Sequence, residues 1–532
     1  MPAEAVVTDN HQWTCTIARM RRQRIIRVTI TALITFALCC TYVIADITDT
    51  ITGPLTLAPV NRRSIPAALQ SLPAGDIAGS ATADKPINSS DADQLVATFA
   101  SATGVGHDYS IAIATADGTV VTQRNAGTPR EPASTMKTLT ALAAASTLDM
   151  GSALATETYL TDTDTTAGTG SLTLVGHGDM LLSAGASDPE HVNGRAGLDT
   201  LAQHTAQALS AQGISQVTLI VDDTLFGQDR YPSRIADNNE GNLYYTGVSA
   251  LAIDGGRQWD GREPENPDIF SAYPTLSQTT ASDAGAVFAA RLADHGITVS
   301  NANDITVESV STAASGNASD STDATDAPTD SDATDSDAAN APTDSASAAP
   351  ATKPIASVQS ATLAEILAFA LRHSDNTLAE EFGRLTALAT GHSNSPQGAT
   401  EAVRATLERL NIDTAGLTMA DCSGLSPGSK LSVHTLVAVQ AHNLTASGAA
   451  AAGEGLSIPG LIGTAANRAV SEDTLGLLRV KTGSLGEVTA MTGNVSRLNG
   501  GTLAFAVIVN HPDDMTAARD AIDAFVDSLA RL

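Results

Sequence analysis

The chain has 532 residues, of which 42% are hydrophobic, so it is long enough for two or three domains with a substantial buried core. Its formal net charge is −29 and only 3% of its residues are aromatic. We expect no nucleic-acid binding, because this charge would repel a phosphate backbone and few rings are available for base stacking.

Residues 1–45 have the features of a targeting segment. Five arginines between Arg19 and Arg27 precede an uncharged, mostly apolar run over residues 28–45. As a helix this run would reach about 27 Å, close to the thickness of a hydrocarbon core. We expect either a signal peptide, cleaved after a small-residue triplet ending at Ala45, or a retained signal anchor. Both alternatives place the rest of the chain outside the cytoplasmic membrane.

The cysteines agree with an exported chain. Three of the four lie at or before residue 40, which leaves Cys422 as the only thiol in the remainder. We therefore expect neither an internal disulfide nor a cysteine metal site there. Residues 46–94 are rich in Pro, Ala, Ser and Thr without clear periodicity, which is typical of a spacer.

The next segments predict folded structure of mixed type. Two short apolar runs at 109–114 and 119–124 flank Ala-Asp-Gly and predict a hairpin, and an Ala/Leu-rich helix begins near Pro132. Residues 156–307 alternate strand-like and helical stretches, which indicates α/β structure. The tract from 311 to 352 consists of Ser, Thr, Ala, Pro, Asp, Gly and Asn, and its composition predicts disorder.

Folded sequence resumes at Ile355. The amphipathic stretch 362–382 predicts one helix, 502–511 a buried strand, and 517–532 a closing helix.

Two short motifs stand out because the chain contains only five lysines. Ser134-Thr135-Met136-Lys137 is its only Ser-x-x-Lys, and Lys481-Thr482-Gly483 is its only Lys-Thr-Gly. Between them lies Ser374-Asp375-Asn376. Each motif alone is weak evidence, since such short patterns occur by chance; the ordered set of three is the stronger signal.

The first motif has a physical interpretation as a nucleophile and its base. Residues three apart share a helical face, so Lys137 can bring its amine to the Ser134 hydroxyl. A helix start also offers free N–H groups to an oxyanion. Burial and a second cation, for which Lys481 is the candidate, would lower the lysine pKa toward neutrality. The alternative is that Ser134 caps the helix while the Lys137 side chain reaches toward solvent.

The other two motifs have similar pairs of interpretations. Ser374 is a candidate hydroxyl relay to the leaving amine, and Asn376 a candidate partner of the substrate backbone or of the lysine; both could instead cap a helix. Lys481 and Thr482 could face a substrate carboxylate at the end of a strand, with Gly483 removing obstruction; the alternative is a turn without special function.

In this order the three motifs resemble those of penicillin-binding proteins and serine β-lactamases. Position 374 follows position 137 by 237 residues, a long gap that is similar to the class C low-molecular-mass penicillin-binding proteins, the D-alanyl-D-alanine carboxypeptidase/endopeptidase family. Further stretches resemble that family, namely GHGDMLL at Gly176, VDDTLFG at Val221, YYTGVSALAIDGG at Tyr244 and DCSGLS at Asp421. The resemblance runs from about residue 95 to the end.

The resemblance implies a set of roles. Ser134 would be acylated, Lys137 would be the base, and Ser374 and Asn376 would relay and orient. The substrate would bind at Lys481, Thr482, Gly483 and Ser484, with Lys481 and Thr482 as the carboxylate site, and the oxyanion hole would use the N–H groups of Ser134 and Ser484. Two departures, a Cys422 where the family usually has glycine and the long acidic tract, affect local loop shape.

The expected fold is α/β (α+β), with a transpeptidase/β-lactamase-like domain in two segments. The expected divisions are 1–45 signal or anchor, 46–94 spacer, 95–159 first transpeptidase segment, 160–307 inserted region, 308–354 acidic tract, and 355–532 second transpeptidase segment. No cofactor is expected, since we find no zinc-ligand spacing and no phosphate-binding glycine loop.

The expected function is trimming of peptidoglycan stem peptides that end in D-Ala-D-Ala, with acylation by β-lactams. The expected location is outside the membrane, either anchored by the N-terminal segment or secreted to the wall. Two rivals remain: a β-lactamase, and a non-catalytic protein that binds the wall or senses β-lactams. Carboxypeptidase and endopeptidase activities differ only in the leaving amine and stay open.

Overall fold

The computed structural model describes residues 29–30, 32, 34–43, 86–309, 353–445 and 449–532. The chain divides into two units, Met1–Ala81 and Thr82–Leu532. In the first unit the described residues, all between 29 and 43, are helical and exposed. Across the described parts of the chain, no helix has both the length and the apolar character that crossing a membrane requires. The expected segment 28–45 and acidic tract 308–354 fall partly outside the described residues, so both stay predictions.

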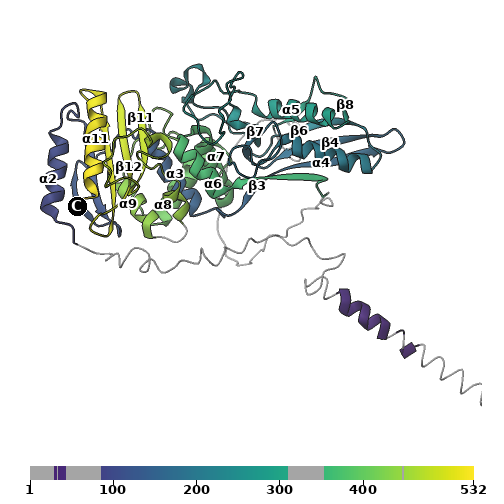
Figure 1. The fold of residues 1–532 in the computed structure, drawn as a ribbon, viewed down its shortest axis with the longest axis horizontal. Helices are drawn as coiled ribbons and strands as arrows, with labels where there is room; N and C mark the ends of the chain where they lie inside the picture. The colour runs from purple at the N-terminus through teal and green to yellow at the C-terminus, as the bar shows by residue number, and fades with distance from the viewer. Residues whose placement is uncertain (1–28, 31, 33, 44–85, 310–352, 446–448) are drawn as a thin grey trace, which may run out of the picture. The chain divides into compact units, whose positions relative to one another are not determined.

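The second unit contains a five-stranded antiparallel sheet built from distant parts of the sequence (Figure 1). Its strand order is β11-β12-β13-β1-β2, so the N-terminal hairpin pairs directly with the C-terminal strands through β1 and β13. The expected hairpin and the expected strand near 502–511 are confirmed. The strands are β1 (Tyr109–Thr115), β2 (Val120–Arg124), β11 (Leu478–Leu485), β12 (Val488–Ser496) and β13 (Thr502–Asn510).

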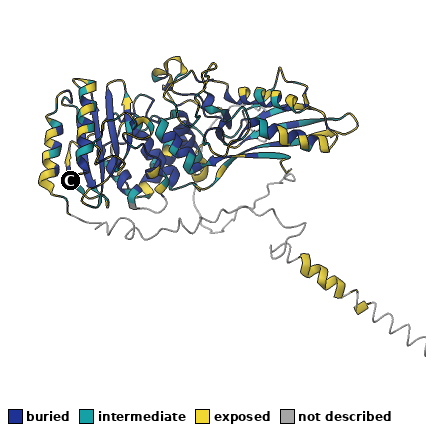
Figure 2. Cartoon of the chain, in the orientation of Figure 1, coloured by how far each residue is buried: buried dark blue, intermediate teal, exposed yellow. Residues whose placement is uncertain are grey.

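Helices cover both faces of this sheet. Successive side chains of a strand point to opposite faces, so strands with uninterrupted apolar runs make both faces apolar. Ile111 and Ile113 of β1 pack in a core with α2 (Ser89–Ala100) and α11 (Met515–Leu529). Ala112 and Ala114 point the other way, into a core with α3 (Lys137–Ala145), α8 (Pro396–Arg409) and α9 (Val433–Thr445). Figure 2 shows the resulting buried strands and helices in dark blue. The expected closing helix is confirmed as α11.

A second sheet has the strand order β10-β3-β4-β6-β8, with β9 also paired to β6. The pairs of β6 with β4, β8 and β9 are parallel, whereas β3 pairs antiparallel with both β4 and β10. Helices α4 (Leu198–Ala211) and α5 (Thr280–Asp294) share its apolar core. The strands are β3 (Ala153–Asp164), β4 (Thr169–Gly176), β6 (Gln216–Asp222), β8 (Thr298–Val299), β9 (Thr306–Glu308) and β10 (Ala356–Thr362).

Stretch 362–382 forms two helices, so the prediction of one continuous helix is wrong. A capping box at Thr362 begins α6 (Leu363–His373), which ends where Ser374 adopts a left-handed conformation with φ 57°. Asp375 then begins α7 (Asn376–Thr390) by accepting a bond from the Leu378 N–H. The break places the second motif at the junction of the two helices.

Shorter elements complete the second unit. Strands β5 (Asp179–Leu182) and β7 (Leu251–Ile253) pair in parallel, and α10 (Ala450–Glu454) is a short helix. Helical turns occur at η2 (Ala133–Met136), η3 (Ile235–Asn238), η4 (Glu240–Asn242), η5 (Asp254–Gly256) and η7 (Gly463–Ala465). The architecture is a mixed α+β fold; the expected domain divisions stay a prediction.

Candidate active site

Ser134 lies in the helical turn η2, immediately before α3. The preceding residue, Ala133, has φ 47°, a left-handed conformation that a residue with a Cβ adopts only at an energetic cost. Two glycines allow other segments to approach this turn. A Cβ at Gly424 would lie 2.1 Å from the Ala133 carbonyl oxygen, and one at Gly483 would lie 2.8 Å from that of Pro132. Tight packing therefore holds the turn of Ser134 between the loop of Gly424 and strand β11.

Lys137 is the first residue of α3 and is only 1% exposed. Its ammonium donates to Ser134 Oγ at 3.0 Å, to Asn376 Oδ1 at 2.6 Å and to the Ser423 carbonyl oxygen at 3.0 Å. Burial lowers the pKa of Lys137 to about 8, although the negative charges of Asp421 and Asp375 oppose this shift. The Ser-x-x-Lys spacing thus brings the Lys137 amine to the Ser134 hydroxyl, and the role of Lys137 as a base stays a prediction.

The second motif reaches the same centre from the junction of α6 and α7. The Asn376 side chain accepts from Lys137 and donates through Nδ2 to the Tyr244 carbonyl oxygen at 2.8 Å. The Ser374 hydroxyl accepts from Lys481 Nζ at 3.0 Å. The structure therefore joins Ser374 and Asn376, the first and last residues of this motif, to different lysines.

The third motif occupies β11, the edge strand of the five-stranded sheet. Lys481 is fully buried, and burial followed by the positive charge of Lys137 lowers its pKa well below the ordinary value. Its ammonium also donates to the Thr482 carbonyl oxygen at 2.9 Å. The Thr482 hydroxyl is 2.8 Å from that of Thr464, and Ser484 is exposed. Because two positive charges repel at short range, the state in which both lysines are protonated is less favourable than it would be for two isolated lysines.

One part of the site was missed as a functional element, although its sequence was noted as DCSGLS. Asp421 is completely buried, and its carboxylate accepts from the N–H groups of Ser423, Gly424 and Ser426. This network folds the loop so that the Ser423 carbonyl faces Lys137. An aspartate two residues before Ser-Gly-x-Ser is a turn signal that could have indicated such a loop.

Cys422, the departure from the family pattern, is buried in the same loop. A Cβ added at Gly383 of α7 would lie only 2.3 Å from its Sγ, so the glycine leaves the space that the thiol fills. Burial raises the pKa of the Cys422 thiol well above its ordinary value, so it stays protonated.

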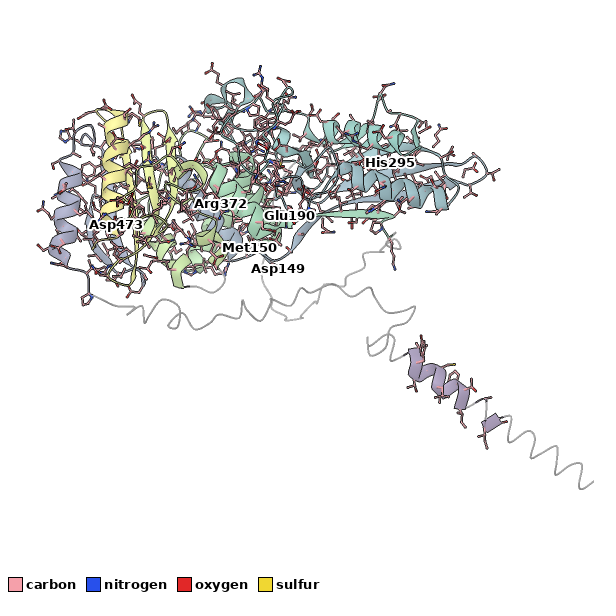
Figure 3. The ribbon with its side chains drawn as sticks, viewed as in Figure 1. Asp149, Met150, Glu190, His295, Arg372 and Asp473 are labelled. Atoms are coloured by element: carbon pink, nitrogen blue, oxygen red, sulfur yellow. The ribbon has the colours of Figure 1, made fainter. Side chains whose placement is uncertain are left out.

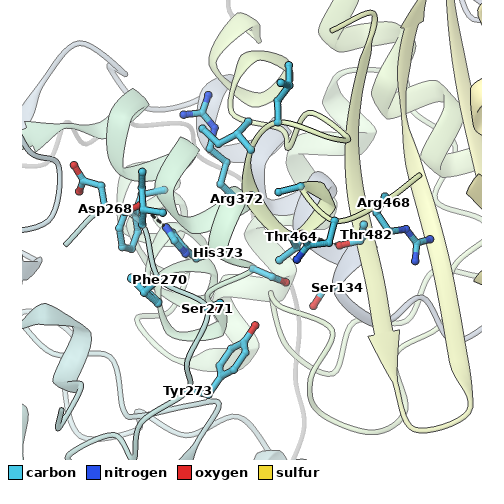
Figure 4. Close-up of a pocket in the computed structure, with 18 of the residues that line it drawn as sticks. Ser134, Asp268, Phe270, Ser271, Tyr273, Arg372, His373, Thr464, Arg468 and Thr482 are labelled. Carbon is cyan, nitrogen blue, oxygen red and sulfur yellow. Dashed lines mark hydrogen bonds between the residues drawn. The ribbon is translucent and has the colours of Figure 1, made fainter. Parts of the chain in front are cut away.

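A cavity of about 1030 Å³ opens beside these motifs (Figure 4). Ser134, Ser374, Thr482 and Ser484 line it, which places a residue of each motif on one surface. Arg372, labelled in Figures 3 and 4, also lines it from the last turn of α6. The rest of the wall includes aromatic and basic side chains, among them Phe270, Tyr273, His373, Arg468 and Arg519. Among the described residues, no group of three or more His, Cys, Asp or Glu side chains is arranged to hold a metal ion.

Comparisons with known proteins agree with this geometry. The family model for D-Ala-D-Ala carboxypeptidase 3 (S13) matches residues 105–268 and 339–532. Carboxypeptidase DacB of Mycolicibacterium smegmatis is 31% identical over 416 residues, which cover 76% of each chain. D-alanyl-D-alanine carboxypeptidase of an Actinomadura species is 27% identical over 429 residues, covering 75% of this chain and 77% of its own.

A solved structure supports the same fold. Penicillin binding protein 4 from Haemophilus influenzae superposes with a TM-score of 0.60 at 18% identity, over 84% of this chain and all of its own. The two ranges that match the family model contain all three motifs. The chain belongs to the D-Ala-D-Ala carboxypeptidase 3 (S13) family.

Proposed function

We propose that this protein is a serine-type D-Ala-D-Ala carboxypeptidase that trims peptidoglycan stem peptides through an acyl-enzyme on Ser134. The observation that carries the proposal is the contact of the Lys137 amine with Ser134 Oγ at 3.0 Å, inside a buried site that lowers the lysine pKa to about 8. An amine with a pKa near neutrality is a suitable general base for a hydroxyl.

In the proposed acylation step, the Ser134 hydroxyl proton passes to the Lys137 amine as Oγ bonds to the carbonyl carbon of the penultimate D-Ala. The oxyanion that forms is held by the N–H groups of Ser134 and Ser484. The proton then passes to the departing amine, with the Ser374 hydroxyl as relay, and the peptide C–N bond breaks. D-alanine leaves, and water hydrolyses the ester to restore Ser134.

In the proposed mechanism, the protonation states of Lys137 and Lys481 depend on each other. A substrate carboxylate beside Lys481, Thr482, Gly483 and Ser484 favours the charged form of Lys481. Because repulsion between two positive charges is mutual, a positive charge at Lys481 would lower the pKa of Lys137 and favour its free amine. Substrate binding would thus prepare the base. Asn376 keeps Lys137 directed at Ser134 through its 2.6 Å bond.

The proposed substrates are stem peptides ending in D-Ala-D-Ala, and β-lactams would acylate the same serine. Endopeptidase action on a cross-link uses the same acyl-enzyme with a different leaving amine. We place this activity outside the cytoplasmic membrane, with the N-terminal segment as cleaved signal or anchor. N-terminal sequencing of protein from its native host tests this: a start near Asp46 indicates cleavage, and an intact terminus in the membrane fraction indicates an anchor.

Labelling with a fluorescent penicillin, followed by mass spectrometry of the modified peptide, tests the mechanism. We expect one adduct, on Ser134. An unlabelled folded protein, or an adduct on another residue, would refute the assignment. Release of D-alanine from a D-Ala-D-Ala peptide separates the enzyme from a non-catalytic β-lactam sensor, and rapid loss of the penicillin adduct would indicate a β-lactamase.

A further inference from the structure

The turn that follows β7 places a guanidinium group beside the second motif. In this turn, Asp254-Gly255-Gly256, the glycines have φ 60° and 80°. A Cβ at Gly255 would lie 2.8 Å from Arg257 Nη1, so the guanidinium folds back over the turn. Nη1 donates to the Asp254 carbonyl oxygen at 3.0 Å and to its Oδ1 at 3.1 Å. The glycines thus make room for one defined orientation of Arg257.

The other end of this guanidinium contacts Asp375. Arg257 Nη2 donates to Asp375 Oδ2 at 2.5 Å, and the two side chains are only 7% and 11% exposed. The Arg257 guanidinium also lies over the rings of Phe270 at 4.6 Å and Phe369 at 5.8 Å. Phe270 stacks on His373 at 4.2 Å, and Figure 4 shows His373 beside it with its bond to Asp268. A buried, aromatic-lined ion pair of this kind has little freedom to move.

Asp375 is the central residue of the second motif, so a fixed carboxylate constrains both neighbours. Its Oδ1 accepts from the Leu378 N–H at 2.9 Å, which leaves Oδ2 for Arg257. On one side of it Ser374 accepts from Lys481, and on the other Asn376 accepts from Lys137. A shift of Asp375 would change both lysine contacts together.

We propose that Arg257 is a positioning residue of the active site: by holding Asp375 it fixes Ser374 and Asn376 on the two lysines and offsets the carboxylate charge near Lys137. This inference rests on the proposed function in naming Lys137 as the base. The contact is a direct hydrogen bond, although Arg257 lies 118 residues before Asp375 in sequence.

The charges around Lys137 determine what loss of Arg257 would do. The negative charges of Asp421 and Asp375 raise the pKa of Lys137 against the effect of burial, and the positive charge of Lys137 lowers the pKa of Lys481 on β11. The carboxylate of Asp421 is satisfied by three backbone N–H groups, whereas that of Asp375 relies on one N–H and Arg257.

The other titratable groups facing Asp375 are His373, Tyr273 and Glu381. Burial lowers the pKa of His373 and raises those of Tyr273 and Glu381, so all three favour their neutral forms. Without Arg257, the charge of Asp375 would act on Lys137 with less compensation. The pKa of Lys137 would then rise, and less free amine would be present at pH 7.

The experiment compares Arg257→Met, Arg257→Lys and Asp375→Asn with the parent protein. Because the chain has five lysines, ¹³Cε-lysine labelling gives few NMR signals, and Lys137→Ala assigns the relevant one. We expect the titration midpoint of Lys137 to move up by about 0.5 to 1 in Arg257→Met and down in Asp375→Asn. Acylation by fluorescent penicillin at pH 7 should slow about three- to tenfold in Arg257→Met and recover at higher pH.

Arg257→Lys keeps the charge but loses the planar fork, so its midpoint should stay near the parent value while acylation slows at every pH. Arg230→Met is the matched control, since Arg230 forms a comparably buried ion pair with Asp223 away from the second motif. An unchanged Lys137 midpoint in folded Arg257→Met, or an equal shift in Arg230→Met, would overturn the proposal. If Arg257→Met does not fold, an unchanged or raised midpoint in Asp375→Asn overturns it. Absence of penicillin labelling in the parent would refute the proposed function separately, because the NMR titration needs no activity.

Discussion

Gly383 and Cys422 pack against each other, and we predict that substitutions at the two positions have coupled effects on the free energy of unfolding. A Cβ at Gly383 would lie 2.3 Å from Cys422 Sγ and 3.1 Å from Cys422 Cβ, well inside normal contact. Overpacking of this kind costs about 3 kcal/mol at the upper end of its usual range, and alanine returns about 1 kcal/mol inside a helix. Gly383→Ala should therefore lower the free energy of unfolding by about 2 kcal/mol.

The matched background is Cys422→Gly, which removes both clashing atoms. The nearest remaining neighbour of the new Cβ is then Ala399 Cβ at 3.3 Å, so Gly383→Ala should become neutral or stabilising by up to about 1 kcal/mol. The coupling energy would be about 2–3 kcal/mol. Urea unfolding of the four proteins, followed by circular dichroism, measures it. An equal effect of Gly383→Ala in both backgrounds would refute the packing argument.

Three further predictions concern catalysis. Lys137→Ala should slow penicillin acylation by about 10² to 10⁴ because the base is lost, and a wild-type acylation rate in this variant would contradict the assignment. Lys430→Ala, at an exposed lysine, should leave the rate unchanged. Lys481→Ala should mainly raise the KM for a D-Ala-D-Ala peptide. The parent acylation rate should rise with pH through about 8, the pKa to which burial lowers Lys137, since only the free amine accepts the proton; a flat profile between pH 6 and 9 would exclude that base. Replacement of residues 311–352 by a short Gly/Ser loop should keep acylation and D-alanine release within about threefold of the parent, because the tract offers no apolar surface and loop closure costs little; a loss beyond about tenfold in a variant that still unfolds cooperatively would show that the tract takes part in the site.

Local rules explain why much of the architecture was predictable. The hairpin at β1 and β2, the strand β13 and the helix α11 follow from apolar periodicity, and each element occurs where it was expected. The contact of Lys137 with Ser134 was predictable for the same reason, since a helical turn brings residues three apart onto one face. Family membership also followed from the order and spacing of the three motifs.

The break between α6 and α7 shows where local rules failed. The residues around Ser374 continue the amphipathic period, so they predicted one helix, yet Ser374 takes a left-handed conformation and ends α6. The contacts of its neighbours stabilise this conformation: Asp375 caps α7 and pairs with Arg257, and Ser374 accepts from Lys481. The cap is local, but Arg257 and Lys481 lie more than 100 positions away, and no short sequence window contains their contacts.

The sequence by itself determined the contact of Lys137 with Ser134, the family and the mixed α+β character, because these depend on short-range spacing, motif order and apolar pattern. The tertiary structure alone decided which partner each lysine has. It brought the Ser423 carbonyl to Lys137 across 286 positions and joined Lys481 to Ser374 across 107. Burial of both lysines in one core then lowered their pKa values, an effect that depends on desolvation and on charge at short range. Long-range packing, which residue spacing does not encode, therefore lowers the pKa of each lysine.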